Sequence, residues 1–561
     1  MFGIVISCAL FVGATQGSGN VEPAEAIYFG GDIVTVDDKC PTAEALAVNK
    51  GRILAVGAKH DVLRHKTDAT RMIDLAGKTL LPGFIDPHSH LMNALMVLDW
   101  ANVSSPPVGT VTDIAGLIAE IKRAELRQKP AKGDWIIAYG YDADLLREHR
   151  PLTRGDLDPY FPDNPVMVIH VSNHGAVLNS AGFERVGISA NTPTPEGGVI
   201  LREEGTNEPA GFIMETAFLP VFMKMPKPSR EKLLEALKPA QDQYAANGYT
   251  TVQEGATSKE DLDFLRLGAG QERLFLDVVS LPVFADAPKI VGQPGYTFGT
   301  YDHRLKLGAV KIITDGSPQY KTAYWSQPLL TVGPVGQKHW RGSRDMTPGE
   351  IDAIFELCYR NEVRVFSHAN GDAAIDMVIA AHRKHNGNRT DRLPIVVHSQ
   401  FMRPEQLDAY AELGMMPSFF TNHTFYWGDI HVQNLGYQRA SFMSPAASAL
   451  KRGLMFSNHT DYTVTPLDPM FTVWTAVNRI SRSGEAIGPT ERVSPLEAIK
   501  ALTVYAAHQY LEHDAKGSLT PGKLADMVIV SANPLAADPM RIKEIRVVET
   551  IKEGRTVYAA P

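Results

Sequence analysis

The most informative segment of this chain is Leu80-Leu81-Pro82-Gly83-Phe84-Ile85-Asp86-Pro87-His88-Ser89-His90. It is an apolar run, punctuated by Pro82 and Gly83, that ends in two histidines two positions apart. Side chains at that spacing in a strand point to the same face, so both imidazoles leave the strand end toward one point. Imidazole is the commonest protein ligand of divalent transition metals. Because the run is apolar on both faces, as in a buried parallel strand, the context favours a metal site over two surface histidines at a turn.

The composition is that of an ordinary globular protein, with 561 residues of which 44% are hydrophobic and 21% charged. This length accommodates a large barrel and a smaller unit. The formal net charge of -8 and the lack of a basic run argue against a surface for nucleic acid or for an anionic membrane. The three cysteines, Cys8, Cys40 and Cys358, form no CxxC or clustered pattern, which excludes a zinc finger and a disulfide framework. A metal must therefore be held by nitrogen and oxygen.

The first twenty residues resemble a secretory signal peptide. Residues 2–14 are almost all apolar, small and polar residues follow up to Asn20, and the run is too short to span a bilayer. The positive start of a signal peptide is missing, since no Lys or Arg precedes Lys39. We expect cleavage of residues 1–20 and a periplasmic or secreted protein without membrane attachment after processing. The alternative is a cytoplasmic protein with an apolar end.

Strand and helix patterns divide the rest of the chain. Short alternating strands in 21–80 and 515–561 predict one small β-sandwich made from both chain ends. Residues 81–514 alternate buried strands with helical stretches, which predicts an α/β (β/α)8 TIM barrel. The interval 91–249 is too long for one βα connection and predicts an inserted subdomain after the first strand. The other seven barrel strands are expected near 250–254, 274–283, 307–313, 363–368, 394–398, 415–420 and 454–457.

Ligand-type residues follow or interrupt five of these apolar strands, at the C-terminal ends where a parallel barrel carries its chemistry. A lone buried histidine is more often a core residue than a ligand. A lysine in an apolar strand is different, because an unpaired buried ammonium is costly and needs a partner or a modification. Five strands that each supply such a residue are hard to obtain by chance. The residues are His88 and His90, Lys311, His368, His398, and Asp461 in the segment 458–461.

Five motifs, at 82–90, 310–317, 368–372, 397–400 and 517–526, carry a resemblance to known proteins. From Ala26 onward the chain resembles the metal-dependent amidohydrolase superfamily and, within it, the third amidohydrolase family, whose members include N-substituted formamide deformylase-like enzymes. The inserted His174 and Glu215 are also similar to that family. The combination is specific, although no single motif is.

The resemblance implies a role for each ligand-type residue. His88 and His90 would bind the more buried metal ion, and His368 and His398 would hold a second one. Lys311 matches a position at which such enzymes can carry an N6-carboxylated lysine. Its carbamate would bridge two ions and turn a buried cation into an oxygen ligand.

The eighth strand departs from the family pattern. The family commonly has Gly-Ser-Asp there, whereas this chain reads Ser457-Asn458-His459-Thr460-Asp461, so an alignment shift of two residues is conceivable. Asp461 is the only carboxylate in the segment, and the resemblance makes it a ligand of the first metal and the general base. His459 is then an extra substrate contact or has no role. His174 and Glu215 would contact the substrate, or else support the site from behind.

The expected function is metal-dependent hydrolysis. A nitrogen and oxygen ligand set suits Zn²⁺ best, with Mn²⁺, Fe²⁺ and Co²⁺ as alternatives, and either one or two ions fit it. We expect cleavage of a non-peptide amide-type C–N bond of a small-molecule amide by a metal-activated water, with Asp461 as general base. The alternatives are a mononuclear-metal aminohydrolase that deaminates a heterocycle and a non-catalytic barrel that serves as a binding scaffold. A homodimer is the default oligomeric state.

Overall fold

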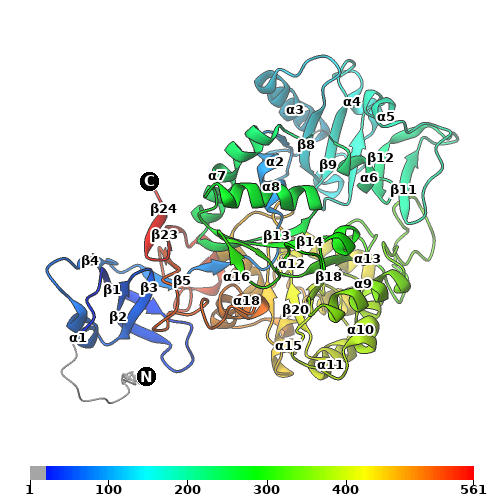
Figure 1. Ribbon diagram of the computed structural model, residues 1–561. Coiled ribbons are helices and arrows are strands. Elements are labelled where there is room, and N and C mark those ends of the chain that lie inside the picture. The colour runs from blue at the N-terminus through cyan, green and yellow to red at the C-terminus, as the bar shows by residue number, and fades with distance from the viewer. Residues whose placement is uncertain (1–20, 226) are drawn as a thin grey trace.

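A parallel α/β barrel forms the centre of the computed structural model, which describes residues 21–225 and 227–561 (Figure 1). Its strands lie in two half-sheets, and backbone bridges Val283–Lys311 and Ser89–Tyr462 join them where they meet. The predicted α/β barrel is therefore confirmed. The predicted signal peptide lies outside the described residues. The barrel strands are β6 (Phe84–Ile85), β13 (Tyr249–Thr257), β14 (Asp277–Pro282), β16 with β17 (Leu305–Leu307, Val310–Ile313), β18 (Val365–Ala369), β19 (Ile395–His398), β20 (Met416–Phe419) and β21 (Ser457–Asn458).

Amphipathic helices surround the strands, and α9 (Pro348–Arg360) illustrates why they form where they do. Thr347 caps its first turn in a capping box with Glu350, and Pro348 occupies the first helical position. The buried side chains recur every three or four residues, so one face packs on the barrel: Ile351, Phe355, Cys358 and Tyr359. The other helices of this part are α8 (Lys259–Gly270), α10 (Asp372–His385), α11 (Pro404–Leu413), α12 (His423–Tyr426), α13 (Gly428–Leu435), α14 (Tyr437–Ser441), α15 (Ala446–Lys451), α16 (Pro469–Asn478), α17 (Pro495–Lys500) and α18 (Val504–Gln509).

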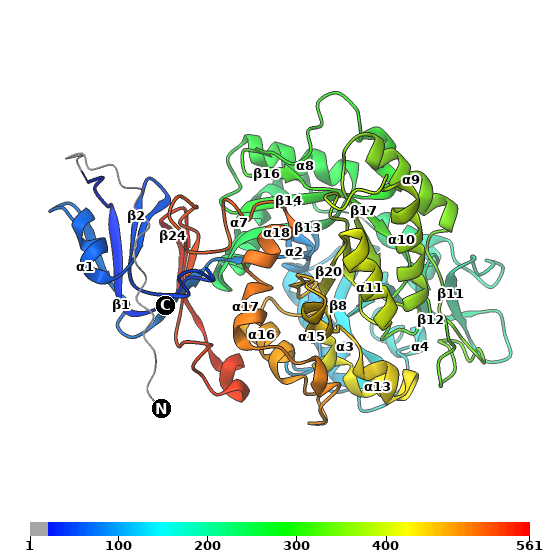
Figure 2. The same ribbon diagram turned by 90° about the horizontal axis from the view of Figure 1, so that it is seen from below.

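The two chain ends build a second unit, and its blue and red strands lie together on one side of the barrel in Figures 1 and 2. Hydrogen bonds connect the strands into a single sheet, so the expected sandwich is one continuous sheet in place of two separate ones. One apolar cluster includes Ile53 near one end of this sheet and Ile551 near the other, so the sheet curls around it. The strands are β1 (Ala26–Val34), β2 (Thr42–Asn49), β3 (Arg52–Gly57), β4 (Arg71–Asp74), β5 (Thr79–Pro82), β22 (Met527–Val530), β23 (Val547–Lys552) and β24 (Arg555–Ala559).

The interval predicted as an insertion contains a six-stranded sheet of its own, with the order β11-β12-β10-β9-β8-β7. The flanking helices α2 (Leu91–Val97) and α7 (Arg230–Ala246) contribute instead to the apolar core of the barrel. The inserted unit is therefore narrower than 91–249. Its elements are β7 (Ala101–Asn102), α3 (Ile114–Gln128), β8 (Ile136–Tyr141), α4 (Arg154–Leu157), β9 (Val166–His170), β10 (Gly175–Leu178), α5 (Ser180–Val186), β11 (Gly198–Arg202), β12 (Pro209–Glu215) and α6 (Leu219–Met223).

Within the described residues, no helix is both long enough and apolar enough to cross a membrane.

Candidate metal centre

The segment 86–90, which follows β6, is held by buried polar contacts. The Asp86 carboxylate accepts hydrogen bonds from the backbone N–H of His88, at 3.3 Å, and from the Ser89 hydroxyl. The Tyr510 hydroxyl donates to the Asp86 carbonyl at 2.7 Å. Burial raises the pKa of Asp86 to about 7, because few charges offset the lost hydration. These contacts fix the backbone from which both histidines project.

Gln253 of β13 sets the tautomer of His88. Its side-chain N–H groups donate to the Pro87 carbonyl, at 2.7 Å, and to the Tyr510 hydroxyl, at 2.6 Å, which turns the amide oxygen toward His88. That oxygen lies 2.6 Å from His88 Nδ1, so Nδ1 carries the proton. Burial and the nearby Lys311 lower the pKa of His88. A neutral imidazole therefore presents a free Nε2 lone pair to the barrel mouth, as a metal ligand must.

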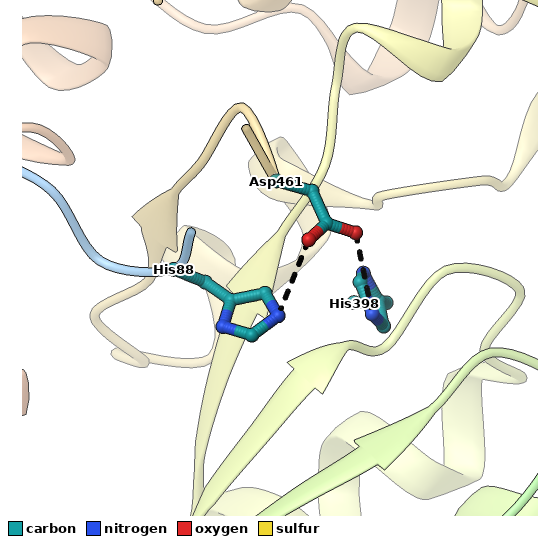
Figure 3. A group of neighbouring side chains, drawn as sticks. All are labelled: His88, His398 and Asp461. Atoms are coloured by element: carbon teal, nitrogen blue, oxygen red, sulfur yellow. Dashed lines mark ion pairs between the residues drawn. The ribbon is translucent and has the colours of Figure 1, made fainter. Parts of the chain in front are cut away.

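The Asp461 carboxylate lies against three imidazoles, of which Figure 3 draws those of His88 and His398. Its Oδ1 lies 3.4 Å from His88 Nε2 and 3.3 Å from His90 Nε2, and Oδ2 lies 3.9 Å from His398 Nε2. Ligand atoms at 2.0–2.1 Å from one tetrahedral ion are roughly 3.3 Å apart, so the spacing suits a shared cation. Burial would raise the pKa of Asp461, but the imidazoles of His88 and His90 hold it well below its usual range. Asp461 is thus an ionised carboxylate.

Lys311, His368 and His398 complete the group. Lys311 Nζ lies 3.3 Å from His88 Nε2, and His398 Nε2 lies 3.1 Å from His368 Nδ1. Burial lowers the pKa of Lys311 to about 7, although Asp461 opposes the shift. Burial also lowers the pKa values of His368 and His398. The structure therefore brings together all six residues that were predicted as ligands.

The ring of His459 packs against those of His88 and His398. Its ring centre is 5.1 Å from that of His88 and 5.0 Å from that of His398, and the residue is fully buried. Burial lowers its pKa to about 3. At this strand end, Asp461 therefore supplies the carboxylate that lies against the imidazoles of His88 and His90.

The residues present fit a divalent cation. Ligand atoms of His88, His398 and Asp461 all lie within 4.8 Å of one another. The Asp461 Oδ1 atom is buried and has no well-aligned hydrogen-bond donor. A buried carboxylate oxygen normally has one, and a cation bound between these nitrogens would take its place.

The inserted subdomain reaches this centre through His174, whose ring centre lies 5.5 Å from that of His368. Its Nδ1 is 2.9 Å from Glu215 Oε2, and the Glu215 side chain is 0% exposed. The structure therefore places the Glu215 side chain against His174 and closed to solvent. Asp345, in the loop after β17, belongs to the same cluster and had no sequence signal.

A cavity of about 200 Å³ lies where the inserted subdomain meets the barrel. One wall contains residues 462–464, which directly follow Asp461. Tyr139 and Trp427 line it, and the Trp427 indole N–H donates to Asp142 at 3.1 Å. The cavity is thus aromatic, with a buried polar edge.

The whole barrel and the later strands of the sheet of the chain ends, from β4 onward, match one family model, described as the amidohydrolase family, over residues 71–558. The chain belongs to the amidohydrolase family. Together with the similar proteins below, this membership makes it a hydrolase acting on C–N bonds other than peptide bonds, and the ligand set makes it dependent on a divalent metal.

Named relatives align with this amidohydrolase over nearly its full length. N-substituted formamide deformylase of Arthrobacter pascens is 26% identical and covers 95% of this chain and 98% of its own. Protein LONG AFTER FAR-RED 3 of Arabidopsis thaliana is 28% identical, with 91% of this chain and 88% of its own. An uncharacterised metal-dependent hydrolase from Pyrococcus horikoshii has the same fold, with a TM-score of 0.71, 22% identity, and coverage of 95% of this chain and 100% of its own.

Proposed function

We propose that this amidohydrolase cleaves a non-peptide amide-type C–N bond of a small molecule at the metal centre, with Asp461 as the general base. The observation that carries the proposal is the convergence of one ionised carboxylate on His88 Nε2 and His90 Nε2, at 3.4 and 3.3 Å. Three nitrogens and one oxygen at the mouth of a barrel form a typical site for hydrolytic Zn²⁺.

The roles of the residues follow from their charge states. A divalent cation, when bound, would lower the pKa of a water molecule from about 15.7 to about 7 and polarise a carbonyl oxygen. Asp461 Oδ2, the oxygen farther from His88 and His90, would accept the proton of the attacking water. The same atom would deliver that proton to the departing nitrogen, which leaves as a neutral amine.

We further propose that Lys311 is carboxylated on Nζ. Its side chain is buried, and a pKa of about 7 leaves much of the amine unprotonated at neutral pH, which is the form that reacts with carbon dioxide. Its Nζ lies 3.3 Å from His88 Nε2, so a carbamate there would place oxygen atoms among the metal ligands. The modification would also remove a buried cation that has no salt bridge within the described residues.

The cavity lined in part by residues 462–464 supports a proposal for the substrate class. Aromatic walls at Tyr139 and Trp427 suit an apolar substituent on the scissile nitrogen. The name of the Arthrobacter pascens relative supports an N-substituted formamide or a related N-acyl compound. We therefore propose such compounds as substrates.

The test is a product analysis on metal-replete enzyme. N-substituted formamides and N-acyl amines should yield equal amounts of amine and carboxylate, a chelator should abolish turnover, and added Zn²⁺ should restore it. Ammonia from aminated heterocycles, with no amide in the panel cleaved, would contradict the proposal and identify a deaminase.

A further inference from the structure

A second group of metal-type ligands lies outside the centre described above. His174 precedes β10, Glu215 ends β12, and Asp345 lies in the loop after β17. Each offers one ligand atom, and the three atoms lie within 4.8 Å of one another. Two of these residues belong to the inserted subdomain and the third belongs to the barrel. The group therefore spans the boundary between the two units.

Three of the four carboxylate oxygens in this group lack a hydrogen-bond donor. Glu215 Oε1 and both oxygens of Asp345 are closed to solvent and accept no hydrogen bond. Over residues 21–225 and 227–561, His174 is the only ion-pair partner of Glu215, and Asp345 has none. Buried carboxylates are normally paired or bound to a metal, because burying their charge is costly. Three oxygen atoms without donors in one cluster therefore point to a missing cation.

The backbone is conformationally strained at Glu215. Glu215 has φ of 49°, in the left-handed region that is unfavourable for a residue other than glycine. Its N–H donates to the His174 carbonyl at 2.9 Å, which ties the two residues together. A side chain at Gly316 would collide with Glu215 Oε1, so the glycine leaves room for this carboxylate. Strain and a shaped space at one residue indicate that its position is needed.

The barrel supplies the third ligand in an equally fixed position. The Asp345 N–H donates to the Thr314 carbonyl at 3.0 Å, and the Thr314 hydroxyl donates to the His368 carbonyl at 2.6 Å. Ligand atoms within 4.8 Å of one another are close enough to bind one ion, and the oxygens are closed to the solvent from which an organic substrate group would come. One imidazole and two carboxylates suit Zn²⁺ or Mn²⁺.

We propose that His174, Glu215 and Asp345 bind a divalent cation that is separate from the catalytic centre and fastens the inserted subdomain to the barrel. The alternative is a protonated His174 that pairs with Glu215 without any ion. The proposal does not depend on which C–N bond the enzyme cleaves.

The metal content of purified variants tests this proposal. After equilibration with Zn²⁺ and removal of free metal, Glu215→Gln and Asp345→Asn should each contain one ion fewer per chain than the wild type. The exposed Glu196 on the same subdomain provides the matched control, and Glu196→Gln should keep the wild-type content. Equal metal content in folded wild type, Glu215→Gln and Asp345→Asn would overturn the proposal.

Anomalous diffraction from wild-type crystals gives a second measurement that needs no variant. At the zinc absorption edge, a peak should lie between His174, Glu215 and Asp345, distinct from the density at Asp461. Density at Asp461 alone would overturn the proposal while leaving the hydrolytic function intact. The Asp461→Asn variant should keep the outer peak, which separates the two sites.

Discussion

At the scale of single residues, the least conventional feature is a lysine in the wall of the barrel. Lys311 is among the largest fully buried side chains, yet it ends beside an imidazole and not beside a carboxylate. An unmodified lysine would be a poor occupant of that position, because its charge is neither hydrated nor paired. Conversion of the amine to a carbamate would remove this unpaired buried positive charge.

Replacing this lysine gives the first prediction. Lys311→Ala should lower kcat by about 10²-fold or more, because the carbamate oxygens that would bind the metal are lost. Short-chain carboxylic acids, which can fill the space with a carboxylate, should restore part of the activity. The measurement is kcat against acid concentration, and a fully active Lys311→Ala enzyme without added acid would contradict the role.

Histidines outside the metal centre give a prediction on pH. Burial lowers the pKa of His431 to about 3, and its ring stacks on that of His423. Between pH 3 and the unfolded value near 6.5 the unfolded chain binds the extra proton, so stability falls as the pH drops below about 6.5. His431→Asn should reduce this loss by about 1 kcal/mol between pH 6.5 and 5.5, because the full slope of about 1.4 kcal/mol per pH unit is reached only well below the unfolded pKa. The free energy of urea unfolding of the wild type and of His431→Asn at pH 6.5 and 5.5 measures this difference. An equal loss of stability in the two proteins would contradict the prediction.

At the scale of elements, buried ion pairs join the sheet of the chain ends to the barrel. Lys552 at the end of β23 lies 2.7 Å from Asp277 of β14 and 2.7 Å from Asp526. Lys516 contacts the same Asp277 carboxylate at 2.6 Å. The two cations hold the pKa of Asp277 below its usual range although its burial acts in the opposite direction. This network fixes the side of the barrel opposite to the metal centre.

Removing one cation should therefore destabilise the protein. Lys552→Met leaves Asp526 buried without its partner, and breaking a buried pair in this way costs about 3–5 kcal/mol. The free energy of unfolding in urea is the measurement. Lys50→Met, at a side chain that is 81% exposed, is the control and should change stability by less than about 0.5 kcal/mol. Equal stability of Lys552→Met and the wild type would show that the network contributes nothing.

The ligands that sequence reasoning could find are those whose strands carry a strong local signal. His368 and His398 each lie at or next to the end of a run of buried apolar residues, and the structure assigns strands to both runs. Asp461 was harder, because β21 has only two residues and its alternation stops before the ligand. Asp345 could not be found, since it lies in a long irregular loop with no period.

The supporting residues also depend on the assembled fold. Gln253 orients His88, but a glutamine in an apolar strand has many structural explanations. The Pro87 carbonyl and the Tyr510 hydroxyl, which comes from a segment 257 residues away, together show which way the amide points. Pairings over such a separation leave no trace in a single sequence.

At the scale of the whole molecule, the barrel, the sheet of the chain ends and the inserted subdomain each contribute to the metal centre or its support. The barrel supplies the metal ligands, the sheet of the chain ends supports its base, and the inserted subdomain places His174 and one wall of the cavity at its mouth. A large insertion at the mouth of a barrel is a natural place for specificity, because it shapes the cavity and leaves the ligands unchanged. The helices α2 and α7, which flank the inserted sheet, pack with the barrel.

The Asp461→Asn enzyme tests whether Asp461 is the general base of this metal-dependent hydrolase. With a substrate from the amide panel, kcat should fall by about 10²–10⁴-fold, because the amide cannot take the proton. Metal analysis of the same sample should still find bound metal, and Asp163→Asn, at a surface carboxylate that is 60% exposed, should be unaffected. An Asp461→Asn enzyme that retains its metal and wild-type kcat would contradict the account.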